Sequence, residues 1–113
     1  MIKHADEMLF RERQMRGGDG LCQTLDFLMP EEMQHCRLFS TITMKKGTSI
    51  GEHNHENETE YYWIVSGEGV VTEADGEKVV KKGDLVITGD GASHAIRNEK
   101  DEPLVFLALI ILD

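Results

Sequence analysis

Residues 47–67, GTSIGEHNHENETEYYWIVSG, carry the pattern that decides the fold. His53 and His55 are two residues apart, so in an extended chain both imidazoles leave the same face of a sheet. The polar residues 56–59 are expected to form a loop. If that loop closes a β-hairpin, Glu60 stands opposite His55, and directly paired residues share a face. The stretch therefore predicts two imidazoles and a carboxylate in one cluster, built without a helix.

A further histidine lies in residues 83–98, GDLVITGDGASHAIRN. His94 begins a predicted strand just after a glycine-rich turn. It can approach the first cluster only if the sheet curls round, as it does in a barrel. Two imidazoles and a carboxylate suit a divalent iron, manganese, nickel, cobalt or zinc ion. The alternative is that the histidines are surface residues of a charged loop, because short motifs produce false positives.

The sequence from residue 36 onward has a β pattern. Residues 36–44 alternate between two faces, and further strands are predicted at 61–65, 70–72, 78–80, 85–88, 94–97 and 104–112. Asp75-Gly76 is predicted to be a two-residue hairpin turn, since glycine readily takes a positive φ. Short strands punctuated by glycine roughly every eight to twelve residues predict an all-β sandwich or closed barrel.

The first thirty residues have the weakest pattern. Residues 5–16 suit either a helix or an extended arm, residues 17–20 (GGDG) indicate a turn or loop, and residues 25–29 suit a short strand. We expect residues 1–35 to form an N-terminal arm or strands within the same domain as a barrel of residues 36–113.

Composition narrows the class of protein. The 113 residues suit one domain, and the net charge of −9 argues against nucleic acid and anionic membranes as partners. The N-terminus lacks the apolar stretch of a signal peptide, and the longest apolar run is too short for a membrane helix. We therefore expect a cytoplasmic protein in which Cys22 and Cys36 stay as thiols.

The spacing of the two stretches resembles the cupin family. Its first motif is matched by Gly47, His53, His55, Glu60 and Gly67. Its second motif is matched by Gly83, Gly91, His94 and Asn98, with Gly89 where the family usually has proline. Because proline would restrict φ before the turn, Gly89 is expected to loosen the loop that carries His94.

The resemblance implies a cupin-type double-stranded β-helix, or jelly-roll, barrel over residues 36–112. It also implies one divalent transition metal per chain, manganese, iron, nickel, cobalt or zinc, held by His53, His55, Glu60 and His94. Similar proteins include oxalate decarboxylases, dioxygenases and sugar isomerases, so the fold does not imply one reaction.

The leading functional prediction is a metal-dependent enzyme, a decarboxylase, dioxygenase or isomerase, acting on a small carboxylate or sugar derivative. The alternative is a non-catalytic small-molecule-binding or sensor protein. Tyr62 shares the inward face with Glu60 and is a candidate acid or hydrogen-bond donor, although a core tyrosine is the commoner role. Decarboxylation would want an arginine facing the substrate, but Arg97 is expected to point outward and Arg37 is ambiguous.

Two further expectations concern surfaces. Glu52, Glu56 and Glu58 are expected to face solvent rather than a metal. Tyr61, Trp63 and Val65 form a second apolar face on the strand that carries Glu60, and a small barrel cannot bury both faces. A homodimer is the expected solution, with strands of residues 1–30 exchanged as one form of it.

Overall fold

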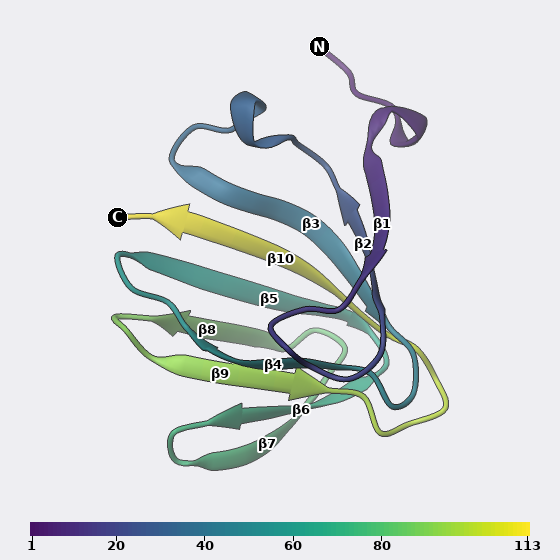
Figure 1. Ribbon diagram of the computed structural model, residues 1–113, viewed down its shortest axis with the longest axis vertical. Helices are drawn as coiled ribbons and strands as arrows, with labels where there is room; N and C mark the ends of the chain where they lie inside the picture. The colour runs from purple at the N-terminus through teal and green to yellow at the C-terminus, as the bar shows by residue number, and fades with distance from the viewer.

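The computed structural model describes residues 1–113, which form ten β-strands and two short 3-10 helices (Figure 1). The strands are β1 (Leu9–Arg13), β2 (Cys22–Asp26), β3 (Cys36–Met44), β4 (Ser49–Asn54), β5 (Glu58–Ser66), β6 (Glu68–Glu73), β7 (Gly76–Lys81), β8 (Leu85–Gly89), β9 (Ser93–Arg97) and β10 (Leu104–Leu112). The 3-10 helices are η1 (Ala5–Glu7) and η2 (Pro30–Glu32). The predicted all-β class is confirmed.

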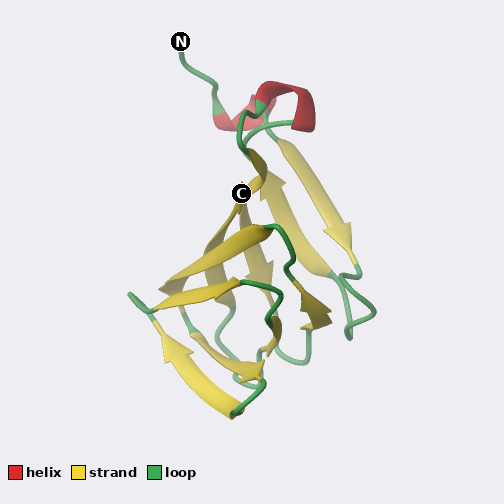
Figure 2. Cartoon of the chain, turned by 90° about the vertical axis from the view of Figure 1, so that its left-hand side faces the viewer, coloured by secondary structure: helices red, strands yellow, loops and turns green.

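The strands form two antiparallel sheets. The six-stranded sheet has the order β1-β2-β3-β10-β5-β8, and the four-stranded sheet has the order β4-β9-β6-β7. Figure 2 shows the two sheets as layers around a common interior, with both 3-10 helices at the end near the N-terminus. No helix is long and apolar enough to cross a membrane.

The core lies between the inner faces of the two sheets. Alternation along each strand sends every second side chain inward, as Ile42 and Met44 do on β3 and Phe106 and Ala108 do on β10. Ile96 on β9 meets them from the opposite sheet as part of the same cluster. Each fully buried large apolar side chain stabilises the fold by about 1.5–3 kcal/mol, so this cluster holds the two sheets together.

The N-terminal segment adds two strands to the larger sheet. Residues 5–16 contain η1 followed by β1, so the extended arm is the correct alternative over most of this stretch. The short strand predicted at 25–29 is displaced, because β2 already begins at Cys22. β1 pairs with β2, which pairs with β3. Cys22 and Cys36 are both free thiols.

The hairpin between β6 and β7 differs by one residue from its prediction. Glu73 pairs with Gly76, so the two turn residues are Ala74 and Asp75 rather than Asp75 and Gly76. Gly76 has a φ of 124°, a value that side-chain-bearing residues rarely adopt. The glycine is therefore needed where the strand resumes.

The outer face of the six-stranded sheet is apolar. Trp63 on β5 lies between Leu85 of β8 and Leu107 of β10, and Tyr61 lies between Ile87 and Leu109 in the same way. The exposed fractions of Trp63 and Ile87 are 49% and 58%. These cross-strand neighbours form one patch, which we call the outer apolar face.

Candidate metal centre

Two of the predicted ligands are direct neighbours in the four-stranded sheet. His53 on β4 pairs with His94 on β9, so both imidazoles project from the same side of that sheet. His55 follows β4 immediately and is tied to the turn before β9. Its N–H donates to Ala92 at 3.0 Å, and its carbonyl accepts from Gly91 at 2.8 Å. These bonds fix the backbone from which the third imidazole projects.

Glu60 reaches the cluster from the opposite sheet. It lies on β5, paired with Ile110 on one side and Thr88 on the other. The predicted hairpin that would set Glu60 opposite His55 is therefore wrong, because β4 and β5 belong to different sheets. The turn between them takes the chain from one sheet to the other, and the carboxylate meets the imidazoles because the two sheets face each other.

The four side chains converge on one point. Nε2 of His94 lies 3.1 Å from Nε2 of both His53 and His55, and 3.0 Å from Oε1 of Glu60. Oε1 of Glu60 lies 2.9 Å from Nε2 of His55 and 3.7 Å from that of His53. All four candidate ligand atoms lie within 4.8 Å of one another. The structure thus brings together every residue that the sequence singled out as a ligand.

The outer nitrogens of the imidazoles define which atoms face the centre. Nδ1 of His53 donates to the carbonyl of Gly51 at 2.7 Å, and Nδ1 of His55 donates to Oε2 of Glu58 at 2.6 Å. Carbonyl and carboxylate oxygens only accept, so in a neutral imidazole the proton sits on Nδ1 and Nε2 keeps its lone pair. Nδ1 of His94 shares a 2.8 Å hydrogen bond with Thr88.

This donor set fits a metal ion. Inward lone pairs from the imidazoles and a carboxylate oxygen repel one another unless a cation or protons lie between them. Imidazoles fixed through their outer nitrogens are the usual arrangement around bound metals. The geometry therefore matches the ligand types expected for a divalent transition metal.

The electrostatic environment of the cluster keeps Glu60 ionised and stabilises a positive charge beside it. Burial raises the pKa of Glu60, but hydrogen bonds to His53, His55 and His94 outweigh it and hold that pKa well below its ordinary range. The hydrogen bond to Glu60 raises the pKa of His55, and Glu58 adds to this effect against the opposing burial. Glu60 is thus a carboxylate at neutral pH, as a metal ligand must be.

Glu58 lies beside the candidate ligands, so the prediction that it faces solvent is wrong. Its side chain is buried against His55 and forms a two-pronged ion pair with Arg37, at 2.6 and 2.7 Å. The Arg37 bond holds the pKa of Glu58 at about 2, against burial and with help from His55. Extending the inward alternation of Glu60 and Tyr62 back by two residues would have found it. Glu52 and Glu56 are exposed, as expected.

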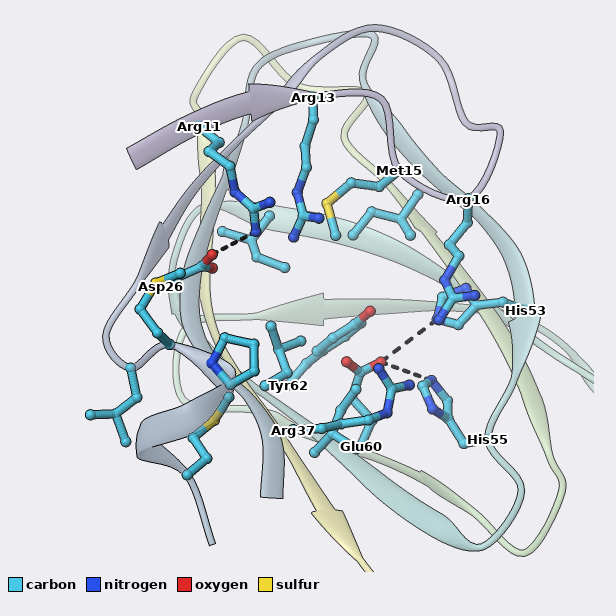
Figure 3. A pocket seen from close by; sticks show the side chains of 18 of the residues that line it. Arg11, Arg13, Met15, Arg16, Asp26, Arg37, His53, His55, Glu60 and Tyr62 are labelled. Carbon is cyan, nitrogen blue, oxygen red and sulfur yellow. Dashed lines mark hydrogen bonds and ion pairs between the residues drawn. The ribbon is translucent and has the colours of Figure 1, made fainter. Parts of the chain in front are cut away.

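A cavity of about 410 Å³ adjoins the cluster (Figure 3). Tyr62 lines it and stacks on His94, with ring centroids 5.0 Å apart. Burial, followed by the charge of Glu60, raises the pKa of Tyr62 well above its ordinary value, so the phenol stays protonated. Ile64, the next inward residue of β5 after Tyr62, lies in the core and does not line the cavity.

Arginines line the cavity as well, although the sequence reasoning could place none inside. They are Arg11, Arg13, Arg16 and Arg37. Three come from the N-terminal arm, where the spacing of Arg11 and Arg13 is the two-residue repeat of one strand face. This spacing indicates that Arg11 and Arg13 share a face, but it does not show whether that face is directed toward the barrel.

Comparison with known proteins assigns the family. Residues 40–110 match the family model described as Cupin_2, cupin domain. This chain belongs to the cupin family. The cupin is 41% identical over 99 residues to an oxalate-binding protein of Thermotoga maritima, covering 87% of this chain and 82% of the relative. It is 39% identical over 71 residues to a gentisate 1,2-dioxygenase of a Streptomyces species, but spans only 20% of that protein.

Solved structures agree with the assignment. A predicted oxalate decarboxylase from Thermotoga maritima matches this cupin with a TM-score of 0.92 and 37% identity, over 100% of both chains. A sugar phosphate isomerase of the cupin superfamily from Silicibacter pomeroyi matches with a TM-score of 0.72 and 20% identity, over 81% of this chain and 60% of that one. The second likeness concerns the fold alone.

Gly89, where the cupin motif usually has proline, has a role beyond the turn. It pairs with Thr59 across β8 and β5. A Cβ at position 89 would lie 2.6 Å from Oγ1 of Thr59, so the threonine side chain fills the space of a larger residue. A looser loop before His94 stays a prediction, but the close approach gives an independent reason for glycine here.

Proposed function

We propose that this cupin binds one divalent transition metal through His53, His55, Glu60 and His94 and uses it to bind a small carboxylate. The observation that carries the proposal is the convergence of three imidazole Nε2 atoms on Oε1 of Glu60, beside a cavity lined by arginines. The packing of an apolar core requires neither feature.

Charge supports an anionic ligand. Three neutral imidazoles and one carboxylate around a divalent cation leave a local charge of about +1. On the cavity wall, Arg13 and Arg16 have no ion-pair partner and add to it, whereas the chain as a whole carries −9. An anion is therefore attracted to this cavity even though the rest of the surface repels it.

The relatives support the same class of ligand. A protein named for oxalate binding shares 41% identity with this chain, and the dioxygenase relative is named for gentisate, a carboxylate. The donor set suits manganese, iron, nickel, cobalt or zinc.

The test is a pair of measurements on the full chain. Elemental mass spectrometry should find close to one divalent transition metal per chain, or uptake of one after stripping and incubation with these metals. Calorimetry should then detect oxalate binding to the manganese-loaded protein and none to the stripped protein. A chain that takes up none of the metals would overturn the proposal.

A second candidate function is turnover of the bound carboxylate, by decarboxylation or dioxygenation. The observation that favours it is Tyr62, a protonated phenol on the cavity wall stacked on His94. When bound, the metal would act as a Lewis acid or bind oxygen, and Tyr62 would donate a hydrogen bond to the substrate. Oxygen uptake and carbon dioxide release with small acids separate this function from non-catalytic binding, and Tyr62→Phe should reduce turnover more than binding.

We also propose that two copies of the chain pair through the outer apolar face. Trp63, Leu85 and Ile87 are exposed on the same face of one sheet. Apolar residues that are contiguous on a surface, unlike single ones, indicate an interaction site. A two-fold dimer is the commonest way to cover such a face.

A further inference from the structure

The arginines of the cavity differ in whether a carboxylate neutralises them. Arg11 forms an ion pair with Asp26 at 2.6 Å, and Arg37 forms one with Glu58. Arg13 and Arg16 form no ion pair with any side chain of the protein. Two positive charges at the cavity therefore have no ion-pair partner in the chain itself, and for Arg13 the charge of Asp26, which is paired with Arg11, is only a partial offset.

Of these two, Arg13 is also short of a hydrogen bond. Its Nε is buried and has no partner in the protein. A buried donor without an acceptor destabilises a fold, and more so when it belongs to a charged group. Burial, followed by the charge of Arg11, lowers the pKa of Arg13 against the opposing charge of Asp26. An anion in the cavity would supply both the acceptor and the charge.

The position of Arg13 is set by the N-terminal arm. It is the last residue of β1 and pairs with Cys22 on β2. Figure 3 shows its guanidinium group directed into the cavity from the side opposite Glu60 and His55. Residue 13 lies outside the part of the chain that matches the cupin model, residues 40–110. The arm thus contributes a cavity residue that the barrel alone lacks.

We infer that Arg13 recognises the second carboxylate of a short dicarboxylate whose first carboxylate is bound at the metal. This inference rests on the proposed function. A guanidinium offers Nε–H and a terminal N–H as parallel donors, which match the two oxygens of a carboxylate. A monocarboxylate on the metal would leave Nε of Arg13 without a partner, so the cavity favours a ligand with an anionic group at each end.

The test compares oxalate and acetate as calorimetric probes on the manganese-loaded full chain. In Arg13→Gln, oxalate affinity should fall by about tenfold or more, the usual effect of losing a charge-assisted hydrogen-bond pair. Acetate affinity should change by less than about threefold, as expected for a distant charge. Manganese content should be unaltered, because Arg13 is not a ligand.

Arg16→Gln is the matched control for charge. It removes an equal charge from the same cavity, but Arg16 has no buried unpartnered nitrogen. Its effect on oxalate should be clearly smaller than that of Arg13→Gln. Arg97→Gln, which alters an arginine paired with Glu77 and Glu99 outside the cavity, should leave oxalate binding unchanged.

Thermal unfolding of the ligand-free proteins separates recognition from a structural role. Removing a half-buried cation whose Nε has no partner should leave the melting temperature of Arg13→Gln equal to or above that of the wild type. A lower melting temperature, equal losses for Arg13→Gln and Arg16→Gln, or equal losses for oxalate and acetate would each overturn the inference. If the wild-type protein binds metal but neither acid, the proposed function itself fails.

Discussion

His55 donates a 2.6 Å hydrogen bond from Nδ1 to Oε2 of Glu58, three residues further along the chain. Glu58 in turn accepts from both Nε and Nη2 of Arg37. This chain of contacts fixes the proton on the outer nitrogen of His55 and turns Nε2 toward Glu60. The two glutamates on the inward face of β5 therefore have different tasks, since one faces the centre and the other orients an imidazole.

Substitution of these glutamates should separate the two tasks. Glu60→Gln should weaken metal binding by about tenfold or more, because it removes a negative ligand. Complete loss of a residue that orients a metal ligand typically reduces metal affinity by about 10- to 100-fold. Glu58→Gln should weaken metal binding by less than Glu60→Gln, because the amide oxygen of the glutamine can still accept the hydrogen bond from His55. Calorimetric titration with manganese measures both.

Glu56→Gln is the control for this series, because Glu56 is exposed and close in sequence. Its metal affinity should match that of the wild type. Equal metal affinities for Glu60→Gln and Glu56→Gln would show that the carboxylate of Glu60 is not a ligand.

Metal binding should depend steeply on pH. Contacts with Glu60 and Glu58 raise the pKa of His55 in the metal-free protein, so its imidazole holds a proton at higher pH than an ordinary histidine. The ion must displace that proton, and apparent affinity therefore rises with pH through the raised pKa. Below about pH 6 the metal should be released. Calorimetry in buffers of different ionisation enthalpy counts the protons expelled near neutral pH, and binding without proton release would contradict this.

Restoring the family's proline at Gly89 should destabilise this protein. A new Cβ would meet the side chain of Thr59, so Gly89→Pro is expected to lower the melting temperature by several degrees, equivalent to about 1–3 kcal/mol of overpacking. Adding Thr59→Ala removes the two side-chain atoms in the way and should recover most of the loss. A double-mutant cycle by thermal unfolding tests the coupling, and additive effects would show that the close approach is unimportant.

The proposed dimer can be tested through the outer apolar face. Trp63 is 49% exposed between two other apolar side chains of the sheet. Trp63→Glu should convert a dimer to a monomer of 12.8 kDa, because it sets a charge within an apolar interface. Light scattering at micromolar concentration is the measurement. A wild-type monomer would reject the dimer, and an unaltered dimer in the variant would reject this face.

Much of the site was readable from local sequence. The two-residue spacing of His53 and His55, the inward position of Glu60 and the turn before His94 each depend on neighbours close along the chain. Alternation in a strand is a local rule, so β3, β5 and β10 were also predictable. The same rule applied two residues earlier would have placed Glu58 inside.

Other features depend on residues far apart in sequence. The meeting of His53 with Glu60 arises because two separate sheets face each other, and not from a hairpin between β4 and β5. The entry of Arg13 into the cavity depends on β1 pairing with β2, which pairs with β3. Local propensity determines which face of a strand is apolar, whereas the pairing of strands and the packing of sheets across the core determine which polar side chains meet at the centre.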